Sequence, residues 1–153
     1  ALWQGIENRT VDVMGSDHAP HTREEKDKEY PLSPSGMTGV QTIVPVMLDH
    51  VSKGHLSIYR LVELLAVKPA EIFKLQNKGT LRVGRDADFT IVDLNKVWKI
   101  KNSWIESKVK WSPFDNYEVK GRPVHTIVRG KIVVQDSEIQ GPPNGEFLEF
   151  SDI

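Results

Sequence analysis

The chain has 153 residues, and its 20 basic and 21 acidic side chains leave a net charge near zero. Hydrophobic residues at 39% and charged residues at 27% are typical of a folded chain and not of a disordered one. The charge balance gives no general electrostatic reason to bind nucleic acid or an anionic membrane, and no apolar run is long enough to span a bilayer. The absence of cysteine excludes disulfides and thiolate metal sites. A complete (β/α)8 barrel is also excluded, since it needs roughly 250 residues.

The first 35 residues combine a helix end, a short strand and two loops. Residues 1–6 place their apolar side chains on one side, as the last turn of a helix would. Alternation over 10–14 predicts a short strand. The segment 15–21 leaves that strand as a loop, because Pro20 favours extended backbone before it. The charged stretch 22–35 is expected to be a loop, either a solvated surface segment or a lid.

Helical spacing dominates the next part of the chain. Apolar residues recur every three or four positions over 40–51, which predicts a helix that ends at Gly54. Ser57 is a suitable N-cap for a second helix over 58–65. Pro69 suits the first position of a third helix, because the first turn lacks acceptors for its N–H groups in any case.

Strand patterns replace helical ones after residue 78. This change predicts two parts, residues 1–78 and residues 79–153. A tight turn at Arg129-Gly130 predicts a hairpin, and the tail from Gly141 is expected to be irregular. The expected strands are 81–83, 87–93, 96–100 and the two hairpin arms 126–128 and 131–134.

One cluster of side chains could carry chemistry. Asp17, His18 and His21 lie within five residues, directly after the strand expected at 10–14. Carboxylate and imidazole are the usual ligands of a zinc-type cation when no thiol is present, and α/β folds place their chemistry at strand ends. The alternative is a capped turn with surface histidines. The remaining histidines are scattered along the chain and are interpreted as structural or exposed: His50, His55 and His125.

The string Gly-Ser-Asp-His-Ala-Pro-His at 15–21 closely resembles the (S/T)DHAPH signature of dihydroorotases in the amidohydrolase superfamily. The resemblance extends over roughly residues 1–136. The other matching segments are 35–42 (SGMTGVQT), 68–73 (KPAEIF), 84–89 (GRDADF), 112–114 (SPF) and 126–130 (TIVRG).

This resemblance implies an α/β fold that is a C-terminal fragment of a (β/α)8 TIM barrel. Residues 1–78 would supply the last strand and helices, and residues 79–153 would be part of a small β-sandwich domain. The implied activity is metal-dependent: reversible hydrolysis of dihydroorotate to N-carbamoyl-aspartate in pyrimidine biosynthesis. The implied cofactor is a divalent metal, with zinc as the expected ion. The family's His-x-His pair is missing here, so the chain is not expected to be active alone.

The resemblance also implies roles for individual residues. Asp17 would be both a metal ligand and the catalytic proton carrier. His21 would bind the carboxylate of the substrate, and His18 would support the loop. Gly36 and Gly39 would let backbone approach the substrate ring, although Gly39 could equally just begin a helix.

Some features leave the substrate open. Gln41 stands where many dihydroorotases have Glu, and allantoinases and hydantoinases share several of the segments. Those relatives usually lack a histidine at the position of His21, so this residue favours dihydroorotate. The second reading is an allantoinase or a hydantoinase/dihydropyrimidinase on the same fold, and the third is a non-catalytic, dihydroorotase-like assembly domain. The expected partners are the remainder of the same enzyme or a complementing chain, a small cyclic amide and further copies in a homo-oligomer. Neither nucleic acid nor membrane is expected as a partner, and the expected location is the cytoplasm.

Overall fold

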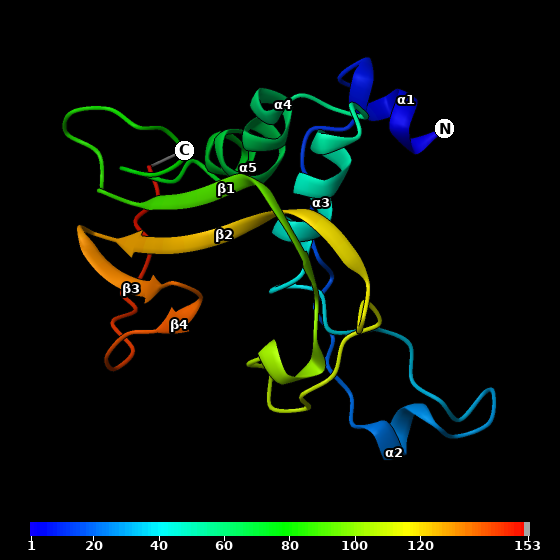
Figure 1. The fold of residues 1–153 in the computed structure, drawn as a ribbon. Helices are drawn as coiled ribbons and strands as arrows, with labels where there is room; N and C mark the ends of the chain where they lie inside the picture. Colours follow the sequence, from blue (N-terminus) through cyan, green and yellow to red (C-terminus); the bar gives the residue numbers. More distant parts are fainter. Residues whose placement is uncertain (152–153) are drawn as a thin grey trace.

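The computed structural model describes residues 1–151 and shows a set of short helices packed beside one antiparallel sheet (Figure 1). The two longest strands run through the middle of the molecule. The loops around α2 lie at the opposite end from α4 and α5 (Figure 1). The helical elements are α1 (Leu2–Glu7), α2 (Arg23–Lys26), α3 (Ile43–Ser52), α4 (Ile58–Val62), the π-helical turn η1 (Glu63–Val67), α5 (Lys68–Ile72) and the 3-10 turn η2 (Asn102–Trp104). The strands are β1 (Phe89–Lys99), β2 (Glu118–Val128), β3 (Lys131–Gln135) and β4 (Glu138–Ile139).

The sheet has the order β1-β2-β3-β4, and every neighbouring pair is antiparallel. The strands expected at 87–93 and 96–100 are one strand, β1, interrupted by an irregularity after Asp93. The Asp93 carboxylate accepts hydrogen bonds from the N–H groups of Asn95 and Lys96, at 2.9 and 3.1 Å, so the break in alternation is a bulge and not a strand end. The predicted hairpin is confirmed: Arg129 and Gly130 both have positive φ between β2 and β3.

The helices after residue 54 are continuous. Ser57 caps α4 as predicted, since its hydroxyl accepts a hydrogen bond from the Arg60 N–H at 3.1 Å. Pro69 lies in the first turn of α5, as predicted, but this third helix is not separate, because α4, η1 and α5 follow one another without a break. Pro69 has no N–H, and its ring crowds the carbonyl four residues earlier, so the wider π-helical turn before it accommodates the proline.

Three other expectations need correction. The segment 10–14 pairs with no strand within residues 1–151; instead the Met14 N–H donates to the Leu64 carbonyl at 3.1 Å. Alternation shows which residues could form a strand, but a ladder also needs a neighbour. Residues 81–83 form a turn-rich connection and not a strand. The charged stretch 22–35 is not all loop, since it contains α2.

Helix α3 packs closely against β2 and forms the centre of the core. Gly121 on β2 has a φ of 110°, and a Cβ there would lie 2.6 Å from the Leu48 Cβ, so glycine permits the close approach. The buried Asp49 carboxylate accepts hydrogen bonds from the Lys120 N–H and from Lys53. Burial alone raises the pKa of Asp49, but these bonds outweigh it and hold the pKa below its ordinary value. One cluster of buried residues in the core consists of Ile6, Met47, Leu48, Leu56, Leu61 and Leu64.

The fold is therefore α/β with a small antiparallel sheet. The division at residue 78 stays a prediction. None of the helices described within residues 1–151 combines the length and the apolar character needed to cross a membrane.

Candidate functional site

The loop that carries Asp17 is held against a second segment. We call residues 15–21 the Asp17 loop and residues 36–42 the strap. His18 and Met37 form a parallel bridge between them, and the Ala19 N–H donates to the Met37 carbonyl at 3.0 Å. Asp17 is exposed and has a φ of 44°, in the left-handed region that Asp tolerates better than most residues. The strap thus supports the loop while the Asp17 side chain is left accessible.

The two glycines of the strap allow this contact. A Cβ on Gly36 would lie 2.6 Å from the Ala19 Cβ, and a Cβ on Gly39 would lie 2.6 Å from the Ser16 carbonyl oxygen. Real side chains do not come so close, so neither position accepts a larger residue without movement of the loop. Gly39 also starts the turn that leads into α3, because its carbonyl accepts hydrogen bonds from the N–H groups of Thr42 and Ile43. Backbone packing therefore accounts for both glycines, independently of any substrate contact.

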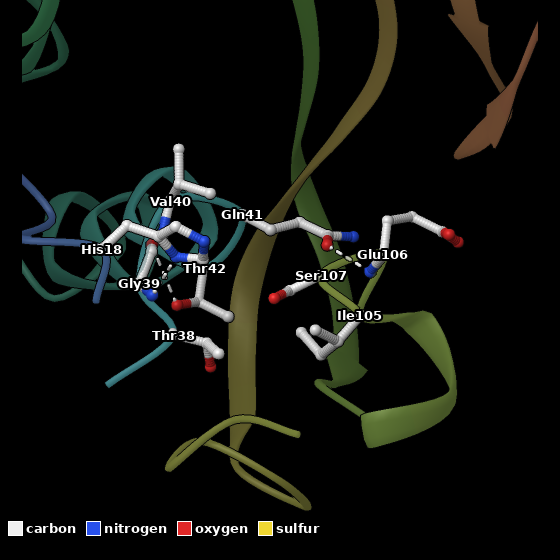
Figure 2. A pocket seen from close by; sticks show the side chains of 9 residues that line it. All are labelled: His18, Thr38, Gly39, Val40, Gln41, Thr42, Ile105, Glu106 and Ser107. Carbon is white, nitrogen blue, oxygen red and sulfur yellow. Dashed lines mark hydrogen bonds between the residues drawn. The ribbon is translucent and has the colours of Figure 1, made fainter. Parts of the chain in front are cut away.

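His18 contacts the strap just before α3. Its Nδ1 accepts hydrogen bonds from the N–H groups of Gly39 and Val40, at 3.1 and 3.4 Å (Figure 2). With this nitrogen engaged, a metal ion could be bound only through the other ring nitrogen.

His21 is held through both its backbone and its side chain. Its carbonyl accepts a hydrogen bond from the Trp111 indole at 2.7 Å, and its Nδ1 lies 3.6 Å from a Glu25 carboxylate oxygen. Thr22 and Glu25 form a capping box that starts α2. The Thr22 N–H that donates to Glu25 lowers the pKa of that carboxyl below its ordinary value, and His21 lowers it further.

A cavity of about 130 Å³ lies between the strap and residues 105–107 (Figure 2). The Gln41 side chain crosses it: the amide donates to the Trp104 carbonyl at 2.7 Å and accepts from the Glu106 N–H at 2.8 Å. The amide can donate and accept at the same time, so Gln41 fixes the 104–106 segment to the strap. The cavity is lined by His18, Thr38, Gly39, Val40, Gln41, Thr42, Ile105, Glu106 and Ser107.

Sequence reasoning missed two of these features. The capping box at Thr22 and Glu25 has a readable signature, a Thr followed three residues later by Glu, and that signature predicts the start of α2. Trp111 carries no such local signal. Its link to His21 spans 90 residues, and only the folded chain brings the two together.

The described residues do not form a metal centre by themselves. Within residues 1–151 no group of three or more His, Cys, Asp or Glu side chains is arranged to hold an ion. Asp17 is chemically suited to be one ligand, because it is an exposed carboxylate on a fixed loop. A catalytic zinc site takes three protein ligands, so the other ligands would have to come from outside this segment.

Comparison with known proteins connects this arrangement to cyclic amide hydrolases. A dihydroorotase from Pyrococcus furiosus is 42% identical over 146 residues, which is 95% of this chain and 34% of that protein. An L-hydantoinase from Paenarthrobacter aurescens is 43% identical over 143 residues, covering 90% of this chain and 31% of that protein. The structure of L-hydantoinase from Arthrobacter aurescens matches with a TM-score of 0.87 and 43% identity, covering 92% of this chain and 32% of that one.

This chain thus spans about a third of the length of the curated relatives that it matches. The sequence profile of the amidohydrolase family, whose enzymes are metal-dependent, matches residues 1–133. That match covers most of the chain and includes the Asp17 loop, the strap and the paired strands β1 and β2. The chain belongs to the amidohydrolase family.

Proposed function

We propose that this chain is the C-terminal part of a longer metal-dependent cyclic amidohydrolase of the dihydroorotase type. The observation that carries the proposal is the Asp17 loop itself: one accessible carboxylate and one histidine, both on backbone fixed by the strap and by Trp111. Residues 1–78 would complete a (β/α)8 barrel, and residues 79–153 would belong to a small β-sandwich domain. Relatives called dihydroorotase at 40–42% identity over most of this chain support this assignment.

Asp17 is proposed to act as a metal ligand and as the proton carrier. A divalent metal, with zinc as the proposed ion, would acidify a water molecule when bound. The Asp17 carboxylate would accept the proton of that water and pass it to the ring nitrogen that leaves as the amide bond breaks. The left-handed backbone and the strap fix the main chain from which this carboxylate projects, and such positioning favours proton transfer over hydrogen-bond distance.

His21 is proposed to bind the carboxylate of dihydroorotate. Its imidazole is about one third exposed, so an anion can reach it, and a ring N–H can donate to that anion. The glycines Gly36 and Gly39 would bring strap backbone near the ring of the substrate, and His18 would support the loop from the other side. The product would be N-carbamoyl-aspartate, and the reaction would be reversible.

A hydantoinase is the second candidate function, because an L-hydantoinase matches this chain as well as the dihydroorotases do. A non-catalytic assembly domain is a third, which the accessible Asp17 disfavours. The proposed partners are the remainder of the enzyme, a small cyclic amide and further copies of the same protein, and the proposed location is the cytoplasm.

The test is a ring-opening assay with the longer, metal-loaded protein on dihydroorotate, hydantoin and allantoin. The proposal expects hydrolysis of dihydroorotate, with a preference that His21→Ala removes. Hydrolysis of hydantoin without any of dihydroorotate would favour the second candidate. The absence of hydrolysis on all three rings would favour the assembly domain.

A further inference from the structure

Trp111 joins three segments at the proposed substrate histidine. Its side chain is buried, with the residue only 7% exposed, and its indole N–H donates to the His21 carbonyl at 2.7 Å. We propose that Trp111 is a positioning residue that sets His21 for the substrate carboxylate, and so determines the preference for carboxylate-bearing rings over carboxylate-free rings. This inference rests on the proposed role of His21.

Two further contacts hold Trp111 in place. The Thr38 hydroxyl donates to the Trp111 carbonyl at 2.6 Å, which ties the tryptophan to the strap. The Arg23 guanidinium lies over the indole ring, 5.0 Å from its centre, which ties it to α2. Arg23 lies only two residues beyond His21, so the indole holds the chain at His21 and immediately after it. Trp111 therefore connects the Asp17 loop, the strap and the 104–112 segment.

The backbone and the ring of His21 are fixed by different groups. Trp111 fixes the backbone carbonyl, while Glu25, itself held by the Thr22 N–H, lies beside the imidazole. Loss of the indole N–H leaves the Glu25 contact in place but lets the His21 backbone move. Because an imidazole N–H must point at the substrate carboxylate, such movement weakens the binding of that anion specifically.

Trp111→Phe isolates this contact in the longer, metal-loaded protein, because phenylalanine keeps an aromatic body and removes only the N–H donor. One lost hydrogen bond to a well-placed carbonyl is expected to raise KM for dihydroorotate by about three- to tenfold. The kcat for dihydroorotate should stay within about twofold, because carboxylate binding is equal in ground and transition states. The KM for hydantoin, which has no carboxylate, should not change.

Trp98→Phe is the matched control. Trp98 makes the same kind of bond, from its indole N–H to the Gly121 carbonyl at 3.1 Å, but it lies in the sheet. Trp98→Phe should leave unchanged the ratio of kcat/KM for dihydroorotate to kcat/KM for hydantoin. Thr38→Val removes the hydroxyl that donates to the Trp111 carbonyl, and it should shift this ratio in the same direction as Trp111→Phe. It tests the positioning role of Trp111 even if Trp111→Phe does not fold.

The outcomes separate this inference from the proposed function. If His21→Ala shifts the ratio and neither Trp111→Phe nor Thr38→Val does, the positioning role is overturned while the role of His21 stands. If Trp111→Phe lowers kcat/KM equally for dihydroorotate and hydantoin, Trp111 has only a structural role. The same conclusion follows if Trp98→Phe shifts the ratio of the two kcat/KM values as Trp111→Phe does. If His21→Ala leaves the ratio unchanged, or the protein does not hydrolyse dihydroorotate, the proposed function fails and the inference fails with it.

Discussion

Gly39→Ala adds one methyl group where the strap and the Asp17 loop touch. The new Cβ would lie 2.6 Å from the Ser16 carbonyl oxygen and 3.2 Å from the Ser16 Cβ. The first neighbour is backbone and cannot swing away, so the two segments must separate by about 0.5 Å to reach an ordinary contact. Asp17 follows Ser16 directly, and this movement therefore displaces the proposed proton carrier.

The expected cost of Gly39→Ala has two parts. Overpacking of a buried contact should lower the free energy of unfolding by about 1–3 kcal/mol. A misplacement of roughly 0.5 Å at a catalytic group should lower kcat by about tenfold. Both are measured on the longer protein, by denaturant unfolding and by ring opening of dihydroorotate.

Gly145→Ala is the control for this prediction, because a Cβ at Gly145 meets nothing within 4 Å. It should change the free energy of unfolding by less than about 0.5 kcal/mol and leave kcat unchanged. Wild-type stability and turnover in Gly39→Ala would refute the packing of the strap on the Asp17 loop.

Three further predictions concern charge and hydrogen bonding. Asp17→Asn should lower kcat at least a hundredfold or so with an unchanged melting temperature, because Asn also tolerates the left-handed backbone but cannot accept the proton; near-normal turnover would contradict the assigned role. Gln41→Glu should lower the free energy of unfolding by about 1–2 kcal/mol in a denaturant titration, since a carboxylate cannot donate to the Trp104 carbonyl, and equal stability would argue against this bridge. Burial, and to a smaller extent the neighbouring His55, lowers the pKa of His50 in the folded chain. The unfolded chain therefore binds a proton more readily, and the free energy of unfolding should fall as the pH drops through about 6.5. This loss should be smaller in His50→Gln, and an identical dependence of stability on pH in the two proteins would refute the prediction.

Local signals in the sequence predicted the elements whose causes are local. Ser57 can be recognised as an N-cap, and the Arg129-Gly130 turn as a hairpin, because the stabilising contacts lie within a few residues. The sequence predicts two strands in place of β1, because the residues after Asp93 break the alternation. In the structure these residues form a bulge, and β1 pairs with β2 on both sides of it. The continuous helix before Pro69 was missed for a similar reason, because proline usually marks a start and here follows a π-helical turn.

The support of the candidate site comes from nonlocal contacts, which the sequence does not predict. The Asp17 loop can be found from its residues, but its support cannot. The strap packs on it through the two glycines, and Trp111 reaches His21 from 90 residues away. The segment 10–14 shows the same limit, since its alternation is that of a strand while its partner strand is absent from residues 1–151. Pairing and positioning depend on neighbours that periodicity does not specify.

The most direct test of the central proposal is the ratio of dihydroorotate to hydantoin hydrolysis by the longer, metal-loaded protein, measured together with its Asp17→Asn variant. The proposal predicts that dihydroorotate is opened to N-carbamoyl-aspartate in preference to hydantoin, and that Asp17→Asn abolishes the reaction while the protein stays folded. Hydrolysis of hydantoin alone, or full activity without the Asp17 carboxylate, would contradict it.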